Sequence, residues 1–304
     1  MATRRTFLGN TAILAAAAMS SWAFNFIKKN PRLSFSTLAC PDWSFKEIID
    51  FAIDHKYQGI EVRGLLRQMD LLQCPEFKTA TSRQSTVQLM QDRDLRFVGL
   101  GSSATLHFAG ILHRQKNLDE GKRYIDLAQQ IGCPYVRVFP NNFPEDQERS
   151  QTIDLIGRGL LELAEHAKGS TVNVLMETHG DLVRANDLLN IMKAVSHEHA
   201  GLLWDVSNMW TITKEPPAEV YKKLKNYILH THIKDARIAY GKLQYTLIGE
   251  GDVPVFEAID ELLNDNYEGY YSFEWEKLWH PELAKPEIAL SHYPKTMRRY
   301  FSKR

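Results

Sequence analysis

The sequence predicts one (β/α)8 barrel, the TIM barrel fold, over residues 25–304. From residue 32 onward, eight short apolar segments alternate with longer amphipathic segments, which is the pattern of repeated strand–helix units. The short segments are almost continuously apolar, as parallel strands are when both of their faces are covered. An open doubly wound sheet would carry a glycine-rich phosphate turn after its first strand, and the stretch ACPD (39–42) has none.

Each expected element follows from a local signal. The first helix begins with a capping box, in which Ser44 is the N-cap and Glu47 its partner. The third helix ends before Gly132, a residue that often terminates helices in a left-handed conformation. The expected strands are, in order, 32–39, 59–63, 96–100, 135–139, 172–177, 201–205, 228–233 and 269–275. The expected helices between them are 44–55, 76–93, 118–131, 151–168, 185–195, 218–226 and 255–264.

Composition supports a single large domain and excludes several classes of function. The chain has 304 residues, of which 44% are hydrophobic, and no linker interrupts residues 32–304. Lys plus Arg and Asp plus Glu each number 37, so the basic surface of a nucleic-acid-binding protein is missing. Three cysteines without CxxC spacing indicate free thiols rather than a disulfide framework or a zinc knuckle. The proline-containing segment after Glu276 is expected to wrap the outside of the barrel or to meet another subunit, and homo-oligomerisation is left open.

The first 24 residues predict an export signal. Arg4 and Arg5 precede a short apolar stretch that ends near Ala18, as in signals read by the twin-arginine translocase. The stretch is too short to span a bilayer as a permanent helix. We therefore expect residues 1–24 to direct the protein to the periplasm, with cleavage after Ala18 or Ala23.

The last four expected strands each end in a side chain that can bind a metal ion. These side chains are, in chain order, Glu177, Asp205, His232 and Glu274. In a (β/α)8 barrel, groups at the carboxyl ends of adjacent strands point into the same mouth. Three carboxylates and an imidazole suit a hard or borderline divalent cation. We expect one such ion, with Mn2+ as the first choice and Mg2+, Zn2+ or Co2+ as alternatives.

The fourth ligand has a competitor. Glu276 shares the strand face of Glu274, so strand alternation does not separate them. We favour Glu274 because it lies nearer the body of the strand, which leaves Glu276 for substrate binding. His230 shares the face of His232 and is interpreted as a core histidine.

Further polar side chains at strand ends are candidates for substrate binding. Arg137 lies inside the apolar strand YVRVF, where an inward-facing guanidinium needs an anion or several acceptors. A substrate hydroxyl or carboxylate could supply these, and so could an ion pair with Glu177 or Glu61. His179 either orients Glu177 or contacts substrate. The full set of substrate-binding candidates is Glu61, His107, Arg137, His179, Lys234 and Glu276.

Five stretches of the sequence resemble the xylose isomerase-like TIM barrel family, which includes sugar phosphate isomerases and epimerases. They are METHGDL (176–182), LLWDVSN (202–208), HTHIKDA (230–236), LIGEGDVPV (247–255) and GYYSFEWEKLWHPE (269–282). The resemblance implies that Glu177, Asp205, His232 and Glu274 hold one divalent ion. Lys234 with Asp235 is similar to the HxKD signature common in that family.

The resemblance implies chemistry on a sugar. Isomerisation and epimerisation next to a ketone both begin when a base removes a proton from the carbon beside a carbonyl, which gives an enediolate. Glu177 and Glu274 are the expected acid/base pair. Because phosphosugars are scarce outside the cytoplasm, the export signal favours an unphosphorylated sugar or keto-sugar. Our leading hypothesis is therefore a metal-dependent isomerase or epimerase.

Three alternatives compete with this hypothesis. A lyase or hydratase acting on oxidised (3-keto) sugars or inosose-type substrates would use the same proton abstraction and then expel a hydroxyl group. A non-catalytic sugar-binding barrel would keep the fold without the reaction. Type IV apurinic endonucleases resemble the fold, but Asn208 stands where their pattern has a histidine, and the chain lacks a phosphate-binding surface.

Overall fold

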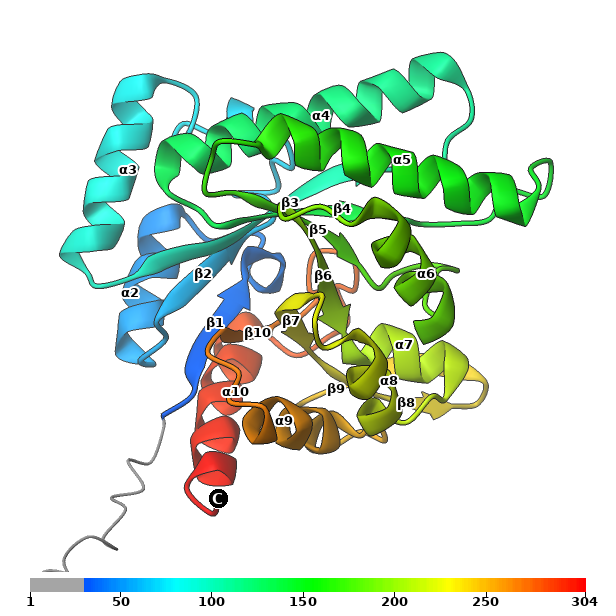
Figure 1. Ribbon diagram of the computed structural model, residues 1–304. Coiled ribbons are helices and arrows are strands. Elements are labelled where there is room, and N and C mark those ends of the chain that lie inside the picture. The colour runs from blue at the N-terminus through cyan, green and yellow to red at the C-terminus, as the bar shows by residue number, and fades with distance from the viewer. Residues whose placement is uncertain (1–29) are drawn as a thin grey trace, which may run out of the picture.

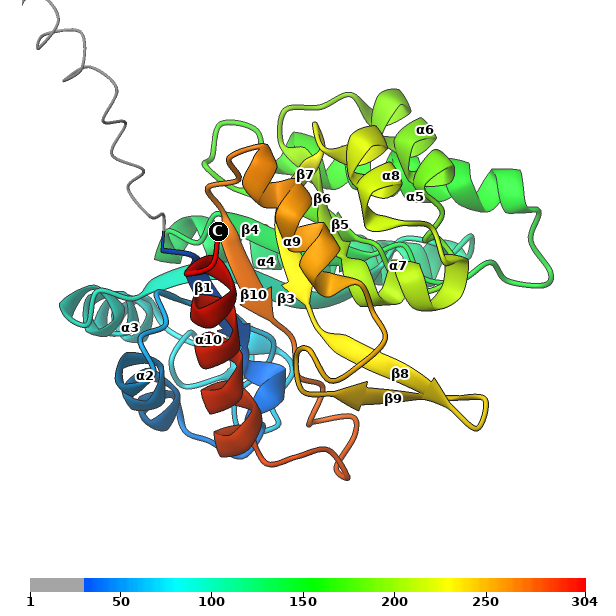
Figure 2. The same ribbon diagram turned by 90° about the horizontal axis from the view of Figure 1, so that it is seen from below.

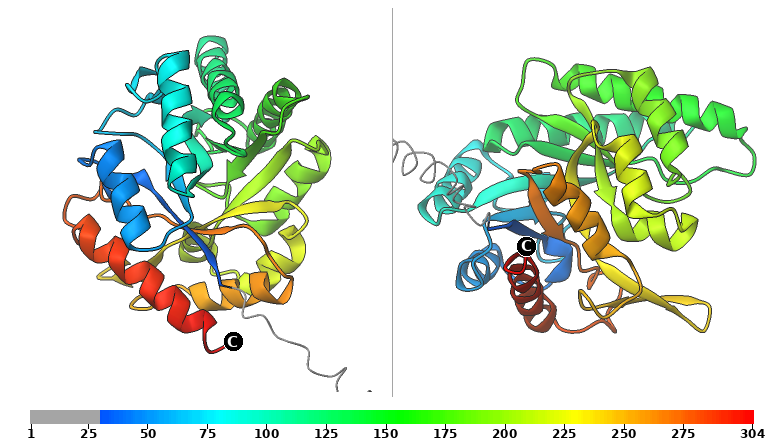
Figure 3. Two further views of the ribbon diagram at one scale, coloured as in Figure 1. Left: turned by 90° about the vertical axis from the view of Figure 1, so that its left-hand side faces the viewer. Right: turned by 60° about the horizontal axis from the view of Figure 1, so that its bottom comes forward.

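The expected (β/α)8 barrel is confirmed by the computed structural model, which describes residues 30–304. Eight parallel strands close in the order β1-β10-β7-β6-β5-β4-β3-β2, and helices surround them (Figures 1 and 3). The export signal expected over residues 1–24 lies outside the described residues. Within the described part, none of the helices has the length and apolar character needed to cross a membrane.

The barrel strands lie close to their expected positions, and the largest differences are at the ends of the first and third strands. Their bounds are β1 Arg32–Ser36, β2 Gly59–Val62, β3 Arg96–Thr105, β4 Tyr135–Phe139, β5 Asn173–Glu177, β6 Ala200–Asp205, β7 Ile228–Ile233 and β10 Tyr270–Phe273. The first strand is shorter than 32–39 because its last three residues form a 3-10 turn, η1 (Thr37–Ala39), capped by the side chain of Ser36. β3 extends five residues beyond 96–100 because Glu120 and Asn117 accept hydrogen bonds from the backbone N–H groups of Ser103 and Thr105.

The helices confirm the expected caps. Ser44 and Glu47 form the capping box of α2, and Gly132 ends α4 with a left-handed φ of 68°. α4 begins at Ile111, seven residues before the expected start. The helices between and after the strands are α2 Phe45–Asp54, α3 Ala80–Asp92, α4 Ile111–Ile131, α5 Arg149–Ala167, α6 Ala185–Val195, α7 Val206–Thr213, α8 Pro217–Leu224, α9 Val255–Asn264 and α10 Pro286–Phe301, with a short 3-10 turn η2 Leu71–Gln73.

Helix α7 and the hairpin of β8 and β9 were not expected from the sequence. Helix α7 follows β6 directly, and Asp205 caps it by accepting a hydrogen bond from Asn208 N. A hairpin of β8 (Asp235–Ala239) and β9 (Lys242–Thr246) follows β7 and projects from the barrel (Figure 2). Its turn holds Tyr240 and Gly241, both with positive φ, as two-residue hairpin turns require.

The C-terminal segment wraps the outside of the barrel, which was one of its two expected placements. Helix α10 lies beside β1 and β10 (Figure 1). The hydroxyl of Tyr293 donates to Tyr271 O on β10, and that of Tyr57 donates to Leu290 O on the helix. α10 therefore covers the strands where the barrel closes. The three cysteines are buried and free, as expected.

Candidate functional site

The four side chains that the sequence predicts as metal ligands converge at the carboxyl end of the barrel. Glu177 and Asp205 are the last residues of β5 and β6, His232 lies near the end of β7, and Glu274 directly follows β10. One donor atom from each lies within 4.8 Å of the others, and all four residues are buried. The imidazole is central, because His232 Nδ1 lies 3.3 Å from Glu177 Oε1, 3.4 Å from Glu274 Oε2 and 3.9 Å from Asp205 Oδ2.

Strand register and a helix cap bring Asp205 into this cluster. β6 and β7 pair in parallel with Asp205 opposite His232, so both leave the sheet at the same level. Asp205 Oδ1 accepts the Asn208 N–H at 2.8 Å and begins α7. The other oxygen, Oδ2, faces His232. A single carboxylate therefore ends a strand, starts a helix and contributes to the cluster.

The geometry separates Glu274 from Glu276. Glu276 is not a member of the four-residue cluster. Its carboxylate accepts hydrogen bonds from Lys234 Nζ at 2.6 Å and from the Tyr245 hydroxyl at 3.0 Å. Tyr245 comes from β9 of the unexpected hairpin, so sequence reasoning had no basis for placing it here. Glu274 is the carboxylate positioned as the fourth donor.

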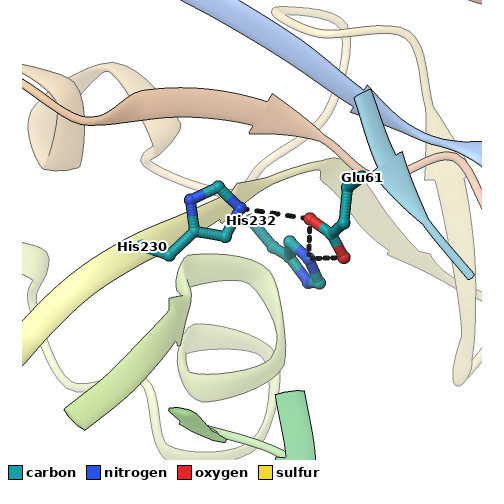
Figure 4. Close-up of side chains that lie close together, drawn as sticks. All are labelled: Glu61, His230 and His232. Carbon is teal, nitrogen blue, oxygen red and sulfur yellow. Dashed lines mark hydrogen bonds and ion pairs between the residues drawn. The ribbon is translucent and has the colours of Figure 1, made fainter. Parts of the chain in front are cut away.

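Glu61 lies against His230 and His232 (Figure 4), on the Nε2 side of the His232 ring and away from the Nδ1 atom that faces the cluster. Its carboxylate accepts hydrogen bonds from His232 Nε2 at 2.9 Å, from His230 Nε2 at 3.1 Å and from the hydroxyl of Ser272 at 3.1 Å. Glu61 is 1% exposed and both of its oxygens are engaged, so its expected contact with substrate does not fit its position. A carboxylate that accepts from His232 Nε2 leaves Nδ1 as the nitrogen that faces the cluster. His230 is a buried histidine that contacts the same carboxylate.

Two buried cations offset the negative charge of the cluster. Lys234 Nζ lies 2.8 Å from Asp205 Oδ2, 2.7 Å from Glu274 Oε2 and 2.6 Å from Glu276 Oε1. Arg137 Nε lies 3.3 Å from Glu177 Oε2. The sequence had left two roles for this guanidinium, a substrate contact and an ion pair, and the ion pair with Glu177 is present. The guanidinium also lies over the Phe139 ring, 3.8 Å from its centroid. Buried carboxylates at this density require such compensation.

The environment shifts the pKa values of the cluster in opposite directions. Burial raises the pKa of Asp205 to about 7, with Glu274 and Glu177 adding to the rise against the opposing charge of Lys234. Burial also opposes ionisation of Glu274, but His232 and Lys234 hold its pKa well below the usual range. The pKa of His232 lies well above its ordinary value, because the charges of Glu274, Glu61 and Glu177 outweigh the effect of burial. The protein side chains alone therefore favour a proton on the imidazole.

A cavity of about 240 Å³ opens onto one side of the cluster. Glu177 and Glu274 line it, whereas Asp205 and His232 lie deeper and are fully buried. Of the substrate-binding candidates, Arg137, His179, Lys234 and Glu276 line the cavity, and Glu61 and His107 do not. The cavity-lining residues are Leu38, Arg63, Arg137, Phe139, Glu177, His179, Lys234, Glu274, Glu276 and Trp279.

His179 and Arg63 line the cavity, whereas His107 does not. His179 is held by Asn141, whose Oδ1 lies 3.1 Å from its Nδ1, and it packs on Phe139. His107 packs against Phe108 with ring centroids 4.1 Å apart, and neither residue lines the cavity. Arg63 lines the cavity but received no role from the sequence, although it lies two residues after Glu61 and directly follows the same strand.

The residues fit a divalent metal ion. Three carboxylates and one imidazole converge, a donor set that suits a hard or borderline cation. Glu177 Oε2 and Asp205 Oδ2 are buried oxygens that make no hydrogen bond of ordinary geometry within residues 30–304. Glu177 Oε2 forms an ion pair with Arg137, and Asp205 Oδ2 forms one with Lys234. Buried anionic oxygens with such incomplete partnering are suited to coordinating a cation.

A model of the xylose isomerase-like TIM barrel family matches residues 49–293. The chain belongs to this family. Family relatives include both epimerases and dehydratases. The chain is 24% identical over 253 residues to 3-dehydroshikimate dehydratase of Bacillus anthracis, a match that covers 76% of this chain and 85% of that enzyme. It is 24% identical over 166 residues to fructoselysine 3-epimerase of Shigella flexneri, covering 53% of this chain and 59% of that enzyme.

Among solved structures, the IOLI protein with a bound zinc atom superposes with a TM-score of 0.76 at 19% identity. The match covers 90% of this chain and 98% of that one. At this identity the likeness concerns the fold.

Proposed function

We propose that this protein is a divalent-metal-dependent isomerase or epimerase of an unphosphorylated keto-sugar. One observation carries the proposal: of the four candidate ligands, Glu177 and Glu274 also line the cavity, while Asp205 and His232 lie beneath it. Two carboxylates are thus positioned to reach both the ion and a bound molecule. The proposal takes Glu177, Asp205, His232 and Glu274 as the metal ligands, with Mn2+ as the first ion to test.

The chemistry requires a base beside a polarised carbonyl. A divalent ion at this site would supply a positive charge that stabilises the oxyanion formed when the neighbouring carbon loses a proton. Glu177 or Glu274 takes that proton, and the electrons of the C–H bond move onto the carbonyl to give an enediolate. The other carboxylate returns a proton to the opposite face for epimerisation. For isomerisation, the proton returns at the neighbouring carbon.

The cationic groups position these bases. Arg137 holds Glu177 from the side, and Lys234 spans Glu274 and Glu276. Lowered pKa values keep Glu177 and Glu274 ionised and able to accept a proton, because Arg137, His232 and Lys234 offset the effect of burial. The cavity lies near the small end of ligand pockets, which run from about 300 to 1,000 Å³. Its size suits a monosaccharide-sized substrate.

Hydrogen exchange with solvent tests the proposal. The Mn2+-loaded protein is incubated in D2O with a panel of keto-sugars, and deuterium at the carbon beside the carbonyl is measured by NMR. Glu177→Gln and Glu274→Gln should each lower the exchange rate by about 100-fold or more. Glu162→Gln, which changes an outer carboxylate paired with Lys122, is the matched control and should exchange at the wild-type rate. Bound metal is measured for each variant, so that loss of the ion and loss of the base are separated.

A dehydratase is the second candidate, and one finding favours it. The match to 3-dehydroshikimate dehydratase covers 85% of that enzyme, against 59% for fructoselysine 3-epimerase. The first proton abstraction would be the same, followed by cleavage of the adjacent C–O bond and departure of the hydroxyl as water after protonation. Product mass separates the two reactions, since dehydration lowers it by one water and isomerisation leaves it unchanged. Tight sugar binding with neither exchange nor mass change across the panel would instead indicate a binding barrel.

A further inference from the structure

Arg63 is a buried cation in the cavity without a carboxylate partner. It lies just after β2, is 6% exposed and lines the cavity. Its Nη2 donates to Ser103 Oγ at 2.9 Å, while Nη1 is buried and has no hydrogen-bond partner within residues 30–304. Across the same part of the chain, no ion pair within 4.0 Å involves Arg63. Burying a guanidinium without an ion-pair partner costs free energy unless a bound anion pairs with it.

The surrounding chain is built to hold this side chain in place. Gly101 lies on β3, and a Cβ added there would come within 2.4 Å of Arg63 Cδ and 2.8 Å of Arg137 Nη2. Both arginine side chains therefore occupy space that only glycine leaves free. The backbone is also fixed, because Arg63 N donates to Thr37 Oγ1 at 2.9 Å. The position of the guanidinium is thus determined by η1, β2 and β3 together.

The other two cations of the cavity are already engaged. Arg137 is paired with Glu177, and Lys234 is paired with Asp205, Glu274 and Glu276. Arg63 instead faces another cation: burial and the charge of Arg137 lower its pKa to about 10. An anion arriving beside Arg63 would relieve both the missing hydrogen bond and the repulsion between the two guanidinium groups.

We propose that Arg63 binds a carboxylate of the substrate, so that the substrate class is a sugar acid or a related keto-carboxylate. This proposal rests on the proposed function, since it names the substrate of the same site. A carboxylate fits better than a phosphate because Nη1 of Arg63 is the buried guanidinium nitrogen without a hydrogen-bond partner within residues 30–304, while the neighbouring cations are held by protein carboxylates. The carboxylate anchors one end of the substrate at β2, which directs the carbonyl toward Glu177 and Glu274.

Equilibrium binding to the Mn2+-loaded protein tests this assignment without requiring turnover. The probes are hexuronates, hexulosonates and cyclic keto-carboxylates, each paired with the analogue in which the carboxylate is replaced by hydroxymethyl. Calorimetry should show at least one carboxylate that binds about tenfold or more tightly than its neutral partner, which corresponds to about 1.4 kcal/mol. Arg63→Gln should abolish that preference, and Arg63→Lys should retain part of it.

The control is Arg93→Gln, which changes an exposed arginine following α3 and should leave the preference unchanged. Circular dichroism and the melting temperature establish that each variant is folded. The assignment is overturned if no carboxylate in the panel is preferred by the wild type, or if the preference survives in Arg63→Gln. Failure of the proposed function gives a different result, in which the carboxylate preference and its loss in Arg63→Gln are intact but no carbon-bound hydrogen exchanges.

Discussion

Glu61 on β2 accepts a hydrogen bond from Nε2 of His232 on β7 at 2.9 Å, although 171 residues separate them in the chain. Because Nε2 donates to Glu61, Nδ1 is the nitrogen that faces Glu177, Asp205 and Glu274, and once deprotonated it would present its lone pair to an ion held there. A single carboxylate on the opposite side of the imidazole thus sets the tautomer and the orientation of the ring. Such supporting carboxylates raise the basicity of a histidine ligand.

Glu61→Gln should weaken metal binding while leaving all four candidate ligands in place. We expect the affinity for Mn2+ to fall about 10- to 100-fold. The amide is a weaker acceptor for His232, and its N–H donors would face neighbouring groups that are themselves donors. Calorimetric titration of Mn2+ into the metal-free protein measures the effect, with Glu162→Gln as the surface control. An unchanged affinity in a folded Glu61→Gln protein would show that His232 does not depend on this contact.

Metal affinity should rise with pH. A metal ligand must be deprotonated, and both the pKa of Asp205, at about 7, and the raised pKa of His232 mean that protons compete with the ion. Protonation is more complete at low pH, so the apparent Kd for Mn2+ should decrease between roughly pH 6 and roughly pH 8. Titrations in buffers of different ionisation enthalpy should also show proton release on binding. A Kd that is flat over this range would contradict the competition.

Lys234→Met should destabilise the metal-free protein strongly. The substitution removes the ammonium that contacts Asp205, Glu274 and Glu276, which leaves like charges buried together. Breaking a buried ion pair from one side costs about 3–5 kcal/mol, measurable by urea unfolding. Lys122→Met, which removes the more exposed pair with Glu162, should cost only about 0–1 kcal/mol. Equal effects of the two substitutions would show that Lys234 does not neutralise the cluster.

Asp235→Ala should loosen the loop that follows the β8–β9 hairpin. The carboxylate of Asp235 accepts backbone N–H groups from Ala236, Gly249, Gly251 and Val253. A buried donor left without its acceptor costs roughly 1–3 kcal/mol, so we expect a loss of at least this size in the free energy of unfolding. Asp146→Ala, in an exposed loop, is the control and should change stability by less than about 0.5 kcal/mol. Faster amide exchange confined to residues 247–253 would locate the effect.

Local patterns were sufficient to predict much of this fold. The strand bounds of β4 and β7 and the helix bounds of α6 and α9 agree with expectation, because their apolar runs end where caps or turns begin. The hairpin and α7 were missed for different reasons. Asp205 is both the last residue of β6 and the N-cap of α7, and in the sequence it was interpreted only as a metal ligand. The hairpin carries its signal in Tyr240 and Gly241, within a stretch too polar to indicate a strand.

The amino-acid sequence by itself determined that strands and helices alternate, where several helices are capped, and which acidic and histidine side chains end the last four strands. Tertiary structure decided the depth of each side chain. Glu61 lies beneath His232 and Glu274 lies beside it. Glu276 pairs with Lys234, and Arg63 lies in the cavity without a carboxylate partner. Alternation along a strand specifies which face a residue occupies. Its height in a closed barrel also depends on the tilt and stagger of neighbouring strands, which arise from pairing between segments far apart in the chain.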